Sequence, residues 1–300
     1  MNHERFNGQR RKLLIGGGVM LVTGALQGRA LAQPQRRVIV VGGALAEVVY
    51  ALGAQAGAHG TLVATDTTCT YPAAARELPK VGYQRALSAE GLLSLRPDLI
   101  LASAEAGPPG VLSQVQKAGV EVVSFPERHD ADTVRGKITG IAGALDATTA
   151  GNALRAQFDN EWQSARRAVE ASALGRSGSP PRILFVLNHT GNQALAAGQN
   201  TAADAMLAYA GARNAMQGFN GYRPLSAEAL VSAAPDIVLI TDEGLSAVGG
   251  PAALLASPGF GATPAGRAKR VVSLDALFLL GFGPRLPAAV TALNQRLGQV

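Results

Sequence analysis

The chain has 300 residues, of which 47% are hydrophobic and 16% are charged, and its formal net charge is +6. This length and this apolar content suit two domains of ordinary size, each with its own hydrophobic core. Because Cys69 is the only cysteine, the composition excludes an internal disulfide, an iron–sulfur cluster and a cysteine-based zinc site.

Residues 1–32 have the pattern of an export signal. Basic residues at 10–12 precede an apolar run at 13–26, and a small-x-small cleavage pattern follows at 30–32. The run is shorter than the roughly 20 residues that a membrane-spanning helix needs. The arginine pair at 10–11 leaves two export routes open, a twin-arginine signal and an ordinary secretory signal. We therefore expect a periplasmic protein.

Without that signal, the chain carries 22 basic and 20 acidic residues, a net charge of +2. The high isoelectric point is therefore largely a property of the export segment. No basic stripe with interleaved aromatic residues argues for nucleic acid, and we expect no insertion into a membrane.

An internal repeat divides the remaining chain into two halves. Residues 87–101 (LSAEGLLSLRPDLIL) and 225–239 (LSAEALVSAAPDIVL) are identical at nine of fifteen positions, with a constant offset of 138. In each copy, a serine (Ser88, Ser226) is a good N-cap for a short helix. A Pro-Asp pair then breaks the helix, and an apolar run follows that is typical of a buried parallel strand.

Further strand-like segments alternate with helical stretches in both halves. This alternation predicts an α/β lobe around a parallel sheet in each half. The predicted strands are residues 37–41, 99–102, 119–125, 182–187, 237–240 and 270–273.

One long amphipathic helix is predicted between the halves, at residues 146–174, with Asp146 or Thr148 as its cap. Its 29 residues would span about 43 Å. The expected organisation is therefore an N-terminal lobe at 33–145, this connecting helix, and a C-terminal lobe at 175–300. The carboxyl ends of the strands should face a cleft between the lobes.

Tyr71 is the strongest candidate for chemistry in that cleft. It lies in the segment 66–85, which should follow a strand of the first lobe and reach the cleft rim. A phenolate oxygen suits ferric iron and is a known axial ligand of haem, and a nearby cation such as Arg85 would favour the anionic form. Taken alone, a Tyr-Pro pair is also typical of an ordinary turn.

The segment TYPAAARELPKVGYQRALSAEGLLSLRPDLILASAEAGPP, which begins at Thr70, resembles the periplasmic haem-binding proteins of bacterial haem ABC importers. The resemblance continues in AAGQNTAADAMLAYAGARNA, NGYRPLSAEAL and ALFLLGFGPRLP, and it covers about residues 36–298. It implies a helical-backbone, class III binding protein, a monomer without enzymatic activity that passes haem to an inner-membrane ABC permease. It also implies that Tyr71 ligates the haem iron.

Other pocket residues follow from the repeat and the resemblance. Arg85 and Arg223 hold nearly equivalent places, and arginine binds carboxylates such as haem propionates through paired hydrogen bonds. We also expect Tyr83, Tyr222 and Phe282 at the pocket, although core packing remains open for all three. Because some relatives use a second-lobe histidine as a further iron ligand, His189 is the candidate for that role.

Glu105 and Glu243 also occupy equivalent places, each just after a predicted strand. The resemblance implies that a two-fold importer binds one acidic residue of each lobe, so both are expected to dock on the permease. Solvated surface glutamates are the alternative.

Three other functions would each require different features of the sequence. A siderophore or cobalamin carrier would share the two-lobed plan without needing Tyr71. A carrier of free metal ions would need clustered ligands, whereas His59, His129 and His189 are far apart in the sequence. A dinucleotide enzyme is disfavoured because the adjacent Gly42 and Gly43 do not fit Gly-x-Gly-x-x-Gly.

Overall fold

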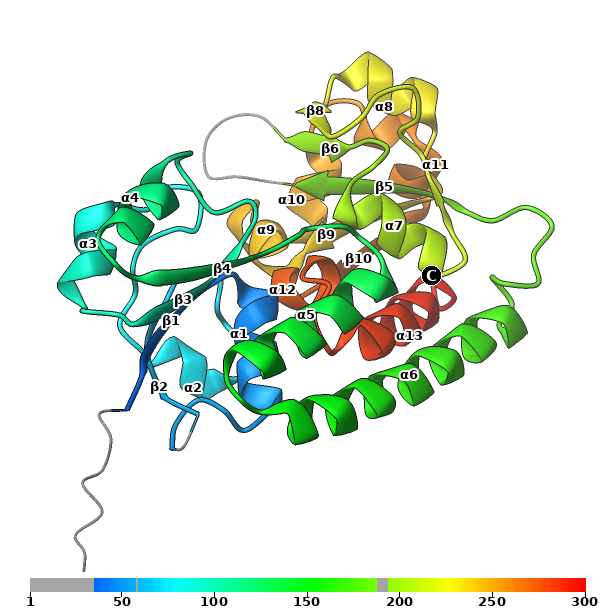
Figure 1. Cartoon of the computed structure of the whole chain (residues 1–300). Coiled ribbons are helices and arrows are strands. Elements are labelled where there is room, and N and C mark those ends of the chain that lie inside the picture. The colour runs from blue at the N-terminus through cyan, green and yellow to red at the C-terminus, as the bar shows by residue number, and fades with distance from the viewer. Residues whose placement is uncertain (1–34, 58, 188–193) are drawn as a thin grey trace, which may run out of the picture. The chain divides into compact units, whose positions relative to one another are not determined.

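A computed structural model describes residues 35–57, 59–187 and 194–300. In these residues the chain forms two sheets with helices around them (Figure 1). The first sheet is parallel throughout, with the strand order β2-β1-β3-β4. Its central strands β1 and β3 are almost wholly buried, as expected for a parallel sheet covered on both faces. The strands are β1 (Arg37–Val41), β2 (Thr61–Thr65), β3 (Leu99–Ser103) and β4 (Glu121–Phe125).

The helices of the first lobe cover both faces of this sheet. Apolar side chains of α1 and α5 pack with one face, and those of α3 and α4 pack with the other. The helices are α1 (Gly43–Ala51), α2 (Ala73–Arg76), α3 (Ala89–Ser94), α4 (Val111–Lys117) and α5 (Ala131–Ala144).

The second sheet has the order β10-β9-β5-β6-β8, and β7 also pairs with β5. The strands predicted from sequence make a parallel core, but the short β6 and β8 run antiparallel and give a mixed sheet that we did not anticipate. The strands are β5 (Arg182–Leu187), β6 (Leu195–Ala197), β7 (Arg213–Asn214), β8 (Tyr222–Pro224), β9 (Ile237–Thr241) and β10 (Val271–Leu274). Seven helices accompany them: α7 (Ala202–Tyr209), α8 (Ala227–Ala233), α9 (Asp242–Ala247), α10 (Pro251–Ala256), α11 (Pro264–Ala268), α12 (Ala276–Leu280) and α13 (Leu286–Leu297).

The internal repeat has the same local structure in both lobes. The hydroxyls of Ser88 and Ser226 accept the N–H of the third residue after each, which confirms both predicted N-caps. The Pro-Asp carboxylates have equivalent partners too, because Asp98 accepts the N–H of Arg37 at 2.7 Å and Asp236 accepts that of Arg182 at 2.8 Å. Each aspartate thereby connects its loop to the first strand of its own sheet.

Helix α6 (Thr148–Ala171) is the predicted connecting helix, and it lies against α5 of the first lobe and α13 of the second (Figure 1). The indole of Trp162 stacks on Phe158 and meets the ring of Tyr209 edge-on, with 4.9 Å between the ring centroids. In the described part of the chain, no helix is both long and apolar enough to cross a bilayer.

The predicted cap of this helix is wrong. The N-cap is Ala147, which makes no side-chain hydrogen bond. Asp146 instead takes a left-handed conformation at the end of α5, with a φ of 53°. Three residues, 145–147, thus separate the two helices, and Asp146 belongs to the end of the first helix rather than capping the second.

Replacing Trp162 with alanine should lower the free energy of unfolding by about 3–5 kcal/mol, because a large buried side chain that packs on Phe158 and on Tyr209 of the second lobe is lost. Urea denaturation followed by far-ultraviolet circular dichroism measures the loss. Gln163→Ala, one position along on the exposed side of α6, is the control. Equal stability of the two variants would contradict the role of Trp162.

Asp236 should contribute stability that depends on pH. Burial alone would raise the pKa of its carboxyl, but the hydrogen bonds and charge of Arg182 lower it below the ordinary value. Such a group stabilises the fold above its unfolded pKa of about 4, and this contribution is lost as the pH falls through the folded value. Asp236→Asn should therefore cost about 1 kcal/mol at neutral pH and progressively less in acid, measured by urea denaturation across the range. A constant difference at all pH values would contradict this account.

Candidate functional site

A cavity of about 790 Å³ lies between the two lobes, within the usual range for small-molecule sites. Its first-lobe wall comes from the segments that follow the strands of the first sheet. Its second-lobe wall comes from loops around the second sheet and from α12. The wall includes residues of both lobes: Gly43, Thr70, Tyr83, Arg85, Glu105, Glu127 and His129 of the first, and Tyr222, Glu243, Leu277, Leu280 and Gly281 of the second.

The lobes approach each other closely at Gly43, at the start of α1. A Cβ atom at this position would lie 2.6 Å from the side chain of Leu277 and 2.6 Å from the carbonyl oxygen of Thr68. Only glycine therefore allows both Leu277 of α12 and the loop after β2 to pack against the start of α1.

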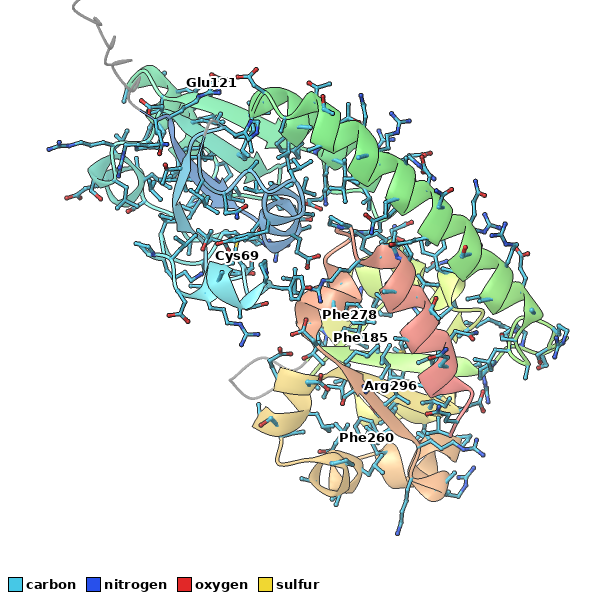
Figure 2. The ribbon with its side chains drawn as sticks, turned by 90° about the horizontal axis from the view of Figure 1, so that it is seen from below. Cys69, Glu121, Phe185, Phe260, Phe278 and Arg296 are labelled. Atoms are coloured by element: carbon cyan, nitrogen blue, oxygen red, sulfur yellow. The ribbon has the colours of Figure 1, made fainter. Side chains whose placement is uncertain are left out.

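The buried carboxylate of Asp66 holds that loop in shape. It accepts the backbone N–H groups of Gly42 at 2.8 Å and Thr68 at 2.9 Å, and the thiol of Cys69 at 3.0 Å. Burial and the neighbouring carboxylate raise the pKa of Cys69 well above its ordinary value. Figure 2 shows Cys69 on the first lobe and Phe278 on the part of the second lobe nearest to it. Cys69 is a free, buried thiol.

Tyr71 follows this loop, and its side chain is 45% exposed. The guanidinium carbon of Arg285, from the start of α13, lies 3.6 Å from the centroid of its ring. Tyr71 and Arg285 line a second cavity of about 450 Å³, whereas the neighbouring Thr70 lines the larger one. Tyr71 therefore lies at the boundary of the lobes, between the two cavities.

Arg285 is in turn bound by Glu47 of α1, which is 5% exposed. Its Nε donates to Glu47 Oε2 at 3.0 Å, and a terminal nitrogen donates to the other oxygen. Burial raises the pKa of Glu47, although Arg285 opposes this shift. Burial would lower the pKa of Arg285, but the bonds to Glu47 raise it.

Sequence reasoning missed this ion pair because its partners are 238 positions apart. Arg285 lies in a segment that resembles the haem-binding family, but no local motif connects it with Tyr71. Arg85, the cation that we expected beside Tyr71, lies elsewhere. It donates to the hydroxyl of Tyr83 at 3.1 Å and forms an ion pair with Glu105.

The second-lobe candidates divide into two groups. Tyr222 lines the larger cavity, where burial raises the pKa of its phenol, with Arg85 and Glu105 nearby. Arg223 instead belongs to the antiparallel strand β8, and its guanidinium lies over Phe219 at 4.9 Å from the ring centroid rather than on the cavity wall. Phe282 is 2% exposed and belongs to the core. Its backbone is left-handed, with a φ of 49°, and the preceding residue, Gly281, lies at the cavity wall instead.

Glu105 and Glu243 are both exposed and both belong to the wall of the larger cavity, one from each lobe. Glu105 is paired with Arg85, and Glu243 lies in the first turn of α9. The repeat that predicted them as equivalent therefore places both beside the same cavity.

The predicted histidine, His189, lies outside the described residues. His129 lines the larger cavity and packs on Phe282, with 5.3 Å between ring centroids. Burial lowers the pKa of its imidazole despite the nearby Glu105 and Glu127. His129 was not among the predicted site residues, although its place shortly after the predicted strand at 119–125 is a signal for the cavity. In the described ranges, no three His, Cys, Asp or Glu side chains are grouped so that they could hold a metal ion.

Several solved structures resemble this fold over most of its length. The periplasmic heme-binding protein BhuT in complex with two hemes is 70% identical, covering 88% of this chain and 98% of that chain with a TM-score of 0.85. The periplasmic heme-binding protein RhuT from Roseiflexus sp. RS-1 in apo form is 38% identical over 88% and 98% of the two chains, with a TM-score of 0.82. HutB, the periplasmic heme-binding protein of Vibrio cholerae, is 32% identical over 87% and 98%, with a TM-score of 0.73.

Curated relatives are more distant. The uncharacterized ABC transporter substrate-binding lipoprotein YvrC of Bacillus subtilis is 26% identical over 253 residues, which are 84% of this chain and 76% of that protein. A vitamin B12-binding protein of Vibrio vulnificus is 29% identical over 140 residues, which are 43% of this chain and 50% of that protein. The family model described as periplasmic binding protein matches residues 38–277. This chain belongs to the periplasmic binding proteins.

Proposed function

We propose that this protein binds ferric haem in the space between its lobes and delivers it to an ABC importer. The observation that carries the proposal is the 70% identity, over 98% of its length, to a heme-binding protein solved with two hemes. The larger cavity suits such a ligand, because apolar groups such as Leu277 and Leu280 can contact a porphyrin face while Arg85 offers a cation for a propionate.

In this proposal, Tyr71 supplies the oxygen that binds the haem iron. Ferric iron accepts phenolate as an axial ligand. Two observations support this role: the ring is half-exposed where the lobes meet, and the preceding residue, Thr70, lines the larger cavity while Tyr71 lines the smaller one beside it. His189 remains a proposed second ligand.

A cobalamin or siderophore carrier is less well supported. The vitamin B12-binding relatives match less than half of this chain, whereas the heme-binding structures BhuT and RhuT each cover 88% of it. We further propose that the protein is a carrier without enzymatic activity, in keeping with a family of binding proteins.

Export and docking complete the proposal. Residues 1–32 direct the chain to the periplasm, where it acts as a monomer. Glu105 and Glu243 then bind basic residues of a two-fold symmetric permease, one from each lobe. This role is supported by their exposed carboxylates, which lie beside the same cavity, one on each lobe.

Tyr71→Phe and Tyr71→Ala should abolish the phenolate-to-iron charge-transfer band of the ferric haem complex and weaken hemin binding at least about tenfold, because each removes the anionic ligand. Visible spectroscopy of the protein titrated with hemin measures both effects. Tyr209→Phe is the matched control, since this tyrosine packs against Trp162 away from both cavities. A band unchanged in the Tyr71 variants would assign the iron to another residue, and His189→Ala would be tested next.

Glu243→Gln should reduce delivery to the importer by more than it changes hemin binding, because one charged contact with the permease is lost. Haem transfer into proteoliposomes that contain the permease measures delivery, and the reduction should shrink at high salt. Glu170→Gln, an exposed position on α6, is the control. Normal delivery by the Glu243 variant at low salt would contradict docking through this residue.

A further inference from the structure

The guanidinium of Arg285 reaches Tyr71 from the opposite lobe. Its carbon lies 3.6 Å from the ring centroid, well inside the limit of about 6 Å for a cation–π contact. The same guanidinium also lies 5.0 Å from the ring centroid of Phe278. Two aromatic rings therefore border Arg285, one from each lobe.

Glu47 fixes the plane of this guanidinium. Both of its carboxylate oxygens accept hydrogen bonds from Arg285, one of them at 3.0 Å. Paired bonds of this kind set orientation as well as distance. Because a carboxylate buried as deeply as Glu47 is costly unless it is paired, the pair orders both of its members.

The backbone before Arg285 is shaped to fit the carboxylate. A Cβ atom at Gly283 would lie 3.0 Å from Glu47 Oε2, so this segment passes directly over the acidic group. A larger residue at Gly283 would push Arg285 away from both Glu47 and Tyr71. The arrangement is thus specified by Glu47 in the first lobe and by Gly283 and Arg285 in the second.

We propose that Glu47 is a positioning residue for the iron ligand: it holds Arg285 over the ring of Tyr71, and the charge of Arg285 strengthens the bond between the Tyr71 oxygen and ferric haem iron. The inference rests on the proposed function, in which Tyr71 binds the iron. The phenol loses its proton on binding, so its ring gains negative charge. The attraction to a cation 3.6 Å away then increases.

In this arrangement, the strength of the bond between Tyr71 and the haem iron depends on closure of the lobes. Tyr71 belongs to the first lobe and Arg285 to the second, so the cation covers the ring only while the lobes are together. Separation of the lobes at the importer removes the cation and weakens the bond to iron. Release then requires no change in Tyr71 itself.

A double-mutant cycle tests the positioning role. Glu47→Ala should raise the rate of hemin loss to excess apomyoglobin about tenfold and shift the phenolate-to-iron charge-transfer band. Arg285→Gln should do the same. In the Arg285→Gln background, Glu47→Ala should add little, because the group that it positions is already gone. Glu47→Gln, which conserves volume, should act in the same direction if the alanine variant does not fold.

Glu121→Gln is the control, since it removes another ion pair, that between Arg36 and Glu121, neither of which lines either cavity. It should leave the hemin loss rate and the band unchanged. Equal effects of Glu47→Ala with and without Arg285 would mean a general structural role and overturn the inference, as would an unshifted band.

Tyr71→Phe separates the two proposals. A retained charge-transfer band refutes Tyr71 as the iron ligand, and the inference with it. A lost band without coupling between Glu47 and Arg285 in the cycle refutes only the role of Glu47.

Discussion

The packing of α6 against both lobes is the constraint on which the rest of the structure depends. Phe158, Trp162 and Tyr209 form a continuous aromatic contact from the middle of this helix into the second lobe. On the first-lobe side, Arg135 of α5 binds Asp159 and lies over Phe158. Because one helix touches both lobes along its length, the carboxyl edges of the two sheets are held facing a common cavity.

Buried charges complete this arrangement where the lobes meet. Besides the pair of Glu47 and Arg285, the fully buried ammonium of Lys137 binds Glu127 at 2.8 Å and approaches the carbonyl oxygen of Phe282 at 3.5 Å. Buried ion pairs contribute little net stability, but an unpaired partner is strongly destabilising. Such contacts therefore favour one relative placement of the lobes over others, which a binding protein needs if closure is to form its site.

The two halves have kept the same framework and diverged at the cavity. Capping serines and strand-binding aspartates are equivalent in both repeats. Arg85 and Arg223 are not, since Arg85 joins Tyr83 and Glu105 at the cavity wall while Arg223 covers Phe219 on an antiparallel edge strand. An asymmetric ligand site can thus form between lobes that share one folding plan.

Local signals in the sequence determined the framework. Apolar runs, the repeated Ser and Pro-Asp positions and the periodicity of α6 predicted the strands, caps and connecting helix, because each depends on residues close together in the chain. The resemblance singled out Tyr71 as a candidate. Only the tertiary structure decided which charged groups surround it: Arg285 rather than Arg85 covers the ring, Glu47 holds that arginine, and Phe282 turns into the core. Such contacts join residues up to 238 positions apart, and they arise from the packing of the two lobes rather than from any local preference of the chain.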